Sequence, residues 1–141
     1  MVKISDEPSI TVRAKLSALW VALMLLYVYA DVLSLFRPGQ IEDMSDGLMG
    51  PVEATQGTLL LAATIVIVPA LMVFLTLTMD ARVCRRTNLV LGILYIGVSA
   101  GNLVGESWAY YLLFGALEIA VTALIVRHAW SWDVSRRPPG R

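Results

Sequence analysis

Four long apolar segments, separated by short polar stretches, dominate the chain. They cover residues 16–36, 57–79, 88–104 and 108–126. A helix needs roughly 20 residues to cross the hydrocarbon core of a bilayer, with a tolerated range of about 17–25. A helix also satisfies its own backbone hydrogen bonds in lipid, where an open strand leaves them unpaired. The pattern therefore predicts an all-α polytopic membrane protein, built as a four-helix transmembrane bundle.

The polar stretches between these segments are short. Residues 37–51 combine acidic side chains with glycine and proline, which is typical of a loop. Residues 80–87 are predicted to form a tight basic turn, and residues 105–107 a minimal hairpin. Such short connections favour an up-and-down order of the helices.

A single membrane domain is expected over residues 1–141, with a flexible cytoplasmic tail at 131–141. The alternative for the first apolar segment is a cleaved signal peptide, because residues 28–30 have the small-residue pattern of a cleavage site. The apolar stretch continues to Phe36, beyond that site. This continuation favours a membrane span.

Lysine and arginine lie almost entirely on one side of the predicted spans. Of the 11 basic residues, Arg37 alone falls on the other side. The rest are Lys3, Arg13, Lys15, Arg82, Arg85, Arg86, Arg127, Arg136, Arg137 and Arg141. Loops rich in lysine and arginine stay in the cytoplasm. Both termini are therefore predicted to be cytoplasmic, in a multi-pass protein of the inner (plasma) membrane.

Composition supports the membrane class and narrows the chemistry. The chain is 57% hydrophobic and 16% charged, against about 45–50% and about 25% in average soluble domains. Its formal net charge of zero gives no indication of a nucleic-acid partner. A single cysteine, Cys84, and a single histidine, His128, exclude an intrachain disulfide and a bis-histidine haem. We expect no enzyme activity, no cofactor and no metal site.

Glu118 is the sharpest exception to the apolar pattern. It lies ten residues after Trp108, about 15 Å along a helix and near the middle of a span. A charged side chain at that depth costs about 2.5–3.5 kcal/mol, and such residues usually face a bundle interior. No lysine, arginine or histidine lies at the same depth. Glu118 is either a neutral acid that fixes helix packing, or a group that holds a proton, cation or polar ligand.

Further polar residues are predicted near the outer ends of the spans. Asp31 and Tyr27 follow one stripe of the first span, and Asn102 and Glu106 follow one face of the third. These stripes predict an outward-opening polar pocket, with Glu118 below it. All five are candidates for a ligand site or an ion pathway.

Simpler interpretations of the two outer carboxylates remain open. Glu106 lies in the predicted turn 105–107, where it could be merely solvated, since carboxylates at membrane ends cost little. Asp31 could be an interface residue that caps its helix or pairs with Arg37.

Glycine and proline mark two further helix features. Gly97, Gly101 and Gly105 recur every four residues, which lets another helix backbone approach closely. We expect that partner helix within the same chain, with a second subunit as the alternative. Pro69, in the middle of the second span, removes one helix hydrogen bond at the Ile65 carbonyl and predicts a kink.

Four tryptophans lie near the predicted membrane interfaces, where an aromatic belt is expected. They are Trp20, Trp108, Trp130 and Trp132.

Two segments carry a family resemblance, residues 15–36 and residues 88–130. The shared features are Tyr-Ala-Asp at 29–31 and Leu-Glu at 117–118. On these the chain resembles a bacterial family of small four-span membrane proteins of unknown function, and more distantly DoxX-like four-helix membrane proteins. The resemblance implies the four-span plan and brings no established activity.

These observations favour a non-catalytic accessory or structural subunit of a membrane complex or homo-oligomer, with the lipid bilayer as its surroundings. The alternative is a small transporter or channel for a proton, cation or small amphiphile. It would use Glu118 and the outer polar pocket. A lipid or quinone enzyme would need a nucleophile, metal cluster or redox pair, and the sequence offers none of these.

Overall fold

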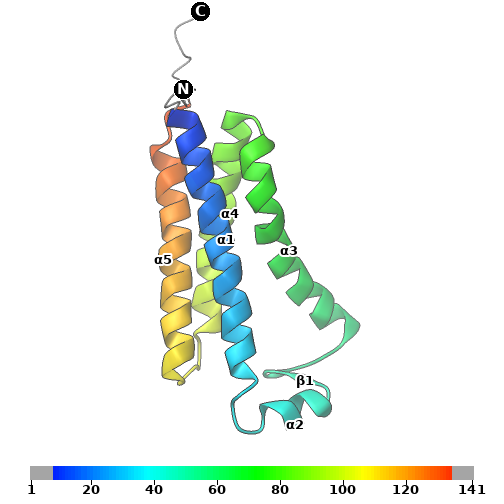
Figure 1. The fold of residues 1–141 in the computed structure, drawn as a ribbon. Coiled ribbons are helices and arrows are strands. Elements are labelled where there is room, and N and C mark those ends of the chain that lie inside the picture. The colour runs from blue at the N-terminus through cyan, green and yellow to red at the C-terminus, as the bar shows by residue number, and fades with distance from the viewer. Residues whose placement is uncertain (1–7, 135–141) are drawn as a thin grey trace, which may run out of the picture.

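Five helices and one small hairpin form the part of the chain that the computed structural model describes, residues 8–134 (Figure 1). They are α1 (Pro8–Ser34), α2 (Gln40–Ser45), β1 (Leu48–Met49), β2 (Val52–Glu53), α3 (Gln56–Thr78), α4 (Ala81–Asn102) and α5 (Ala109–Ser131). The predicted all-α class is confirmed. Residues 135–141, most of the predicted tail, lie outside the described residues.

Three helices are long and apolar enough to cross a membrane: Thr11–Ser34 within α1, together with the whole of α3 and α5. The fourth long helix, α4, has 22 residues but begins among arginines at Arg82, Arg85 and Arg86, which lower its mean hydropathy. The turn predicted at 80–87 is wrong, because α4 already begins at Ala81. Arginine is a good helix former, and these side chains leave the helix backbone intact.

The connection between α1 and α3 is more ordered than a plain loop. It contains α2 and an antiparallel hairpin that pairs Leu48 with Glu53 and Met49 with Val52. Gly50 lies in the hairpin turn with φ 60°, a left-handed conformation that glycine adopts without strain. The glycine and proline residues of this connection predicted a loop. Each strand has only two residues, which is too short to produce an alternating hydrophobic pattern in the sequence.

The long helices form a bundle in which α1 packs on α3 and α5, and α4 packs on α5. The beginnings of α1 and α4 and the ends of α3 and α5 gather at one end, here called the arginine end (Figure 1). The opposite end, here called the loop end, carries α2 and the hairpin. Figure 1 shows α3 leaning away from the other helices toward the loop end. Its buried residues, Pro69, Met72 and Thr76, all lie in its second half.

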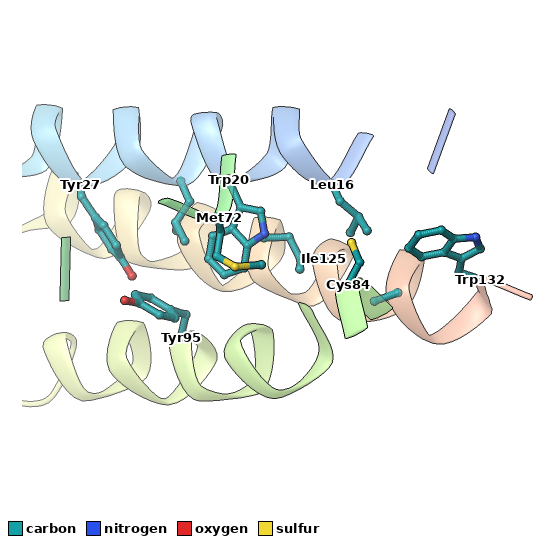
Figure 2. Packing of buried hydrophobic residues seen from close by; sticks show 10 residues of the cluster. Leu16, Trp20, Tyr27, Met72, Cys84, Tyr95, Ile125 and Trp132 are labelled. Atoms are coloured by element: carbon teal, nitrogen blue, oxygen red, sulfur yellow. The ribbon is translucent and has the colours of Figure 1, made fainter. Parts of the chain in front are cut away.

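Inward-facing residues recur at alternating spacings of three and four. On α1 they are Leu16, Trp20, Leu23, Tyr27 and Ala30, each under one-tenth exposed. This is the spacing of a seam between helices that cross at a shallow angle. Figure 2 shows Tyr27 from α1 and Tyr95 from α4 pointing into the same region of the core.

Two glycines that the sequence pattern did not single out allow α4 and α5 to approach. A Cβ at Gly92 would lie 2.7 Å from Val126 Cγ2, and one at Gly115 would overlap the Leu103 side chain. The glycine stripe behaves differently. No atom outside the local backbone lies within 4 Å of a Cβ built at Gly97, Gly101 or Gly105. The expected intrachain partner for this stripe is therefore wrong among the described residues, because the stripe lies outside the face of α4 that carries its buried residues.

A comparison of two substitutions tests this assignment. Gly92→Ala should lower the free energy of unfolding by about 1–3 kcal/mol, because the stiff Val126 side chain must move. Gly97→Ala should leave it unchanged or raise it by up to about 1 kcal/mol, since alanine is the better helix former and meets no neighbour. Denaturant unfolding in detergent micelles, followed by helical circular dichroism, measures both. Equal destabilisation by the two changes would contradict the packing described.

Candidate functional site: a polar seam through the bundle

Polar side chains form a connected cluster in the half of the bundle nearest the arginine end. The Trp20 indole N–H donates to Asn88 Oδ1 at 2.7 Å. The Asn88 amide donates to the Cys84 carbonyl at 2.8 Å and to Thr76 Oγ1 at 3.4 Å. The Cys84 thiol donates to the Thr76 carbonyl at 3.3 Å. The cluster joins α1, α3 and α4, and all four side chains are fully buried.

Trp20 and Trp132 correct the predicted aromatic belt. Trp20 is fully buried and Trp132 is 5% exposed, so both belong to the core. Trp108 and Trp130 are exposed, as belt residues would be. Sequence position alone did not separate the two pairs. Because α1 begins at Pro8, Trp20 lies in the middle of this helix, where the internal acceptor Asn88 satisfies its N–H.

The kink residue Pro69 creates the next polar contact. Proline has no N–H, so the carbonyl four residues earlier, that of Ile65, loses its helical partner. The Tyr95 hydroxyl donates to this carbonyl at 2.6 Å. The Tyr95 ring also meets the Trp20 ring edge-on, with the ring centroids 5.7 Å apart. The proline therefore couples α3 to α4 as well as shaping α3.

Glu118 lies one layer further toward the loop end and faces the bundle interior. Its side chain is 4% exposed and shares a hydrogen bond with Ser99. The Ser99 hydroxyl also lies 3.2 Å from the Tyr27 hydroxyl, within hydrogen-bonding distance. Tyr27, Ser99 and Glu118 form a buried triad contributed by α1, α4 and α5. Ser99 completes the triad because it is fully buried and lies between the other two.

Arg37 holds the helices together at the loop end. Its Nη2 donates to Glu106 Oε2 at 2.8 Å, and its Nε donates to the Tyr110 hydroxyl at 2.6 Å. The guanidinium lies over the rings of Trp108, Tyr110 and Tyr111 at 5.0–5.4 Å from their centroids. Cations are attracted to aromatic faces at such distances. This group, called here the Arg37 clamp, ties the end of α1 to the beginning of α5.

The clamp corrects both simpler interpretations of the outer carboxylates. Glu106 is not merely solvated, because its side chain is 13% exposed and paired with Arg37. Its other oxygen, Oε1, accepts the backbone N–H groups of Ser107 and Trp108 at 2.8 and 2.9 Å. The alternative in which Asp31 pairs with Arg37 is wrong, since this guanidinium contacts Glu106 and aromatic side chains.

The structure does not gather the five predicted pocket residues into one outward-opening pocket. Tyr27 and Glu118 are buried in the triad, and Glu106 belongs to the clamp. Asp31 and Asn102 are exposed. Heptad spacing from Ser17, which bonds α3, and from Tyr95 places both on the side that faces α3. At this level α3 leans away, which explains their exposure (Figure 1).

Asp31 still contributes to the electrostatics of the triad, because its carboxyl lies close enough to interact with that of Glu118. Within residues 8–134, no group of three His, Cys, Asp or Glu side chains is arranged to hold a metal ion. The arrangement can position a proton between hydroxyl and carboxyl groups of the triad.

The buried polar cluster and the triad together are called here the polar seam. The sequence pattern did not predict that Asn88, Cys84 and Thr76 belong to it. The signal was present in the spacing of Cys84, Asn88, Tyr95 and Ser99, which continues one helical face. It was hidden because residues 80–87 were assigned to a turn.

Burial opposes the charged form of Glu106, but the hydrogen bonds outweigh it. The backbone N–H of Trp108, then the guanidinium of Arg37, hold the pKa of this carboxyl below its usual value. A lowered folded-state pKa stabilises the fold above the unfolded pKa of about 4.3. That contribution is lost as the pH falls through the folded pKa.

Glu106→Gln should therefore be less stable than the wild type at pH 6, by about 1 kcal/mol. The difference should shrink as the pH falls from about 5, because the wild-type carboxyl becomes protonated. Unfolding in micelles at a series of pH values measures this, with Glu53→Gln in the exposed hairpin as the control. A gap between wild type and Glu106→Gln that stays constant down to pH 3 would contradict the ion pair.

Comparisons with known proteins give one match. The model of a family described as a family of unknown function, DUF6326, matches residues 6–137, which is most of the chain. Neither a curated protein nor a solved structure matches. Because the match covers nearly the whole chain, the protein belongs to the family of unknown function DUF6326.

Proposed function

We propose that this protein is a non-catalytic, four-span accessory or structural subunit of the inner membrane, with both termini in the cytoplasm. The direction of the chain supports the fourth span. Both α3 and α5 run from the loop end toward the arginine end, and α4 returns along the bundle between them (Figure 1). The arginine end gathers Arg13, Arg82, Arg85 and Arg127, which favours its cytoplasmic placement. The more distant DoxX-like resemblance agrees with this plan and remains a prediction.

One observation carries the structural role. In the described part of the chain, no buried side-chain nitrogen or oxygen lacks a hydrogen-bond partner. A transport path needs polar groups that exchange partners with water or substrate, whereas a packing seam satisfies its polar groups internally. Internal hydrogen bonds satisfy Trp20, Asn88, Tyr95 and Ser99, as expected of a packing seam.

The proposed assembly surface lies on the outer face of α4. Gly97 is two residues from the inward-facing Tyr95, about 200° around the helix, and so points away from the core. Gly97 and Gly101 are exposed, and a Cβ built at either would meet no atom within 4 Å outside the local backbone. In a bilayer, small residues that face outward allow the close helix contacts that hold transmembrane helices together. A second copy of this chain supplies a helix of matching apolar length, so a homo-oligomer is the proposed assembly.

The double substitution Gly97→Leu with Gly101→Leu tests this assembly. It should shift the protein from oligomer to monomer without lowering its own unfolding stability, because the added side chains meet only the partner. Single-molecule photobleaching in vesicles measures the number of copies per particle. Ala120→Leu, an equally exposed position on α5, is the matched control and should leave the oligomer intact. A wild-type monomer, or an oligomer that the double substitution leaves unchanged, would overturn the proposal.

Glu118 supports a second candidate, a small transporter or channel for a proton, cation or small amphiphile. Glu118 is buried at mid-span, and the carboxyl of Asp31 lies close enough to interact with it. Such a position costs free energy, so a role in packing or in transport is needed to explain it. Under the structural proposal, Glu118→Gln keeps the hydrogen bond with Ser99 and leaves flux at the level of protein-free vesicles. Proton and monovalent-cation flux into proteoliposomes is the measurement. Wild-type flux above that level, abolished in Glu118→Gln, would establish the transporter instead.

A further inference from the structure

A hollow of about 400 Å³ lies at the arginine end, between the first turns of α4 and the residues that follow α5. Three arginines dominate its lining. The lining residues are Arg82, Arg85, Arg86, Leu89, Asp133 and Val134. Three guanidinium groups against one carboxylate leave two positive charges in excess. This composition fits an anionic ligand that also has an apolar part.

The position of Arg85 is fixed by the fold. Its Nε donates to the Ala129 carbonyl and its Nη2 to the Trp130 carbonyl, both at 3.1 Å. These bonds occupy the carbonyls at the end of α5 and anchor one wall of the hollow. Arg82 and Arg86 are exposed at its mouth. Arginine binds phosphate oxygens through its planar fork of N–H groups, which makes a phosphate the best match for this pair.

A second, apolar hollow adjoins the first on α4. It has a volume of about 290 Å³ and is lined by Arg86, Thr87, Val90 and Leu91. Arg86 lines both hollows, so the two lie on either side of one side chain. Val90, which is 65% exposed, continues the apolar surface away from the arginine end. A charged hollow that adjoins an apolar groove has the shape of a phospholipid, with its phosphate at one end and an acyl chain at the other.

We propose that these two hollows bind one anionic phospholipid, with its phosphate between Arg82 and Arg86 and an acyl chain along Val90. The inference rests on the proposed membrane-spanning orientation, which puts the arginine end at the cytoplasmic leaflet where anionic lipids are found. Inorganic phosphate shares the headgroup chemistry, but it would leave the apolar groove empty. A bound lipid would also brace the ends of α4 and α5 that Arg85 already joins.

The test measures the thermal unfolding of the full chain in neutral detergent while lipid is added. Phosphatidylglycerol should raise the unfolding temperature of the wild type in a saturable manner, and phosphatidylcholine should raise it much less. Arg82→Gln with Arg86→Gln should weaken the apparent affinity for phosphatidylglycerol roughly thirtyfold, at about fivefold for each charge removed. Arg127→Gln is the matched control, because Arg127 belongs to the same end of the molecule and lines neither hollow.

Three results would overturn the proposal. They are equal effects of the two lipids, an equal loss in Arg127→Gln, or full stabilisation by inorganic phosphate alone at the same concentration. The last result would indicate an anion site without a lipid. The Gly97→Leu, Gly101→Leu variant should keep the lipid effect while losing the oligomer, so this proposal and the assembly proposal fail separately.

Discussion

A carbonyl without a helical partner, that of Ile65, sets the constraint on which the rest of the bundle depends. Pro69 removes its usual donor, and lipid supplies no replacement. The hydroxyl of Tyr95 fills the role at 2.6 Å. This bond fixes α4 against α3, and the Tyr95 ring then sets the edge-on position of Trp20, whose N–H reaches Asn88. The one carbonyl that Pro69 leaves without a helical donor is therefore the starting point of hydrogen bonds and ring contacts that join α1, α3 and α4.

The two ends of the bundle are closed by arginines in different ways. At the loop end Arg37 pairs with Glu106 and lies among aromatic rings. At the arginine end Arg13 donates to the Met79 carbonyl at 2.6 Å and lies over the Trp132 ring, while Arg85 holds the last carbonyls of α5. Positive side chains near helix C-termini also interact favourably with the helix dipole. The first half of α3 takes part in neither closure, and its leucines Leu60 and Leu61 are exposed.

The sequence predicted the helical class and the inward position of Glu118, because the lengths of the apolar segments and the position of one acid within them are local features. It could not predict which helix each face meets. Gly97 and Gly101 have the spacing of a packing stripe, yet a Cβ built at either meets no atom within 4 Å outside the local backbone. Gly92 and Gly115 follow no regular pattern, yet a Cβ built at either would clash with a neighbouring side chain. Which glycine is packed depends on which face of its helix meets a neighbour, and that follows from tertiary contacts.

The central claim is that the polar seam is a closed packing contact that water does not enter. The most direct test places a thiol at Ser99, which is fully buried within the triad, in a Cys84→Ala background. Membrane-impermeant thiol reagents are then applied to each side of sealed vesicles. Ser99→Cys should remain unlabelled from both sides, while Ser107→Cys in the exposed turn labels rapidly from one. Labelling of Ser99→Cys from either side would show that water reaches the seam and would contradict a purely structural role.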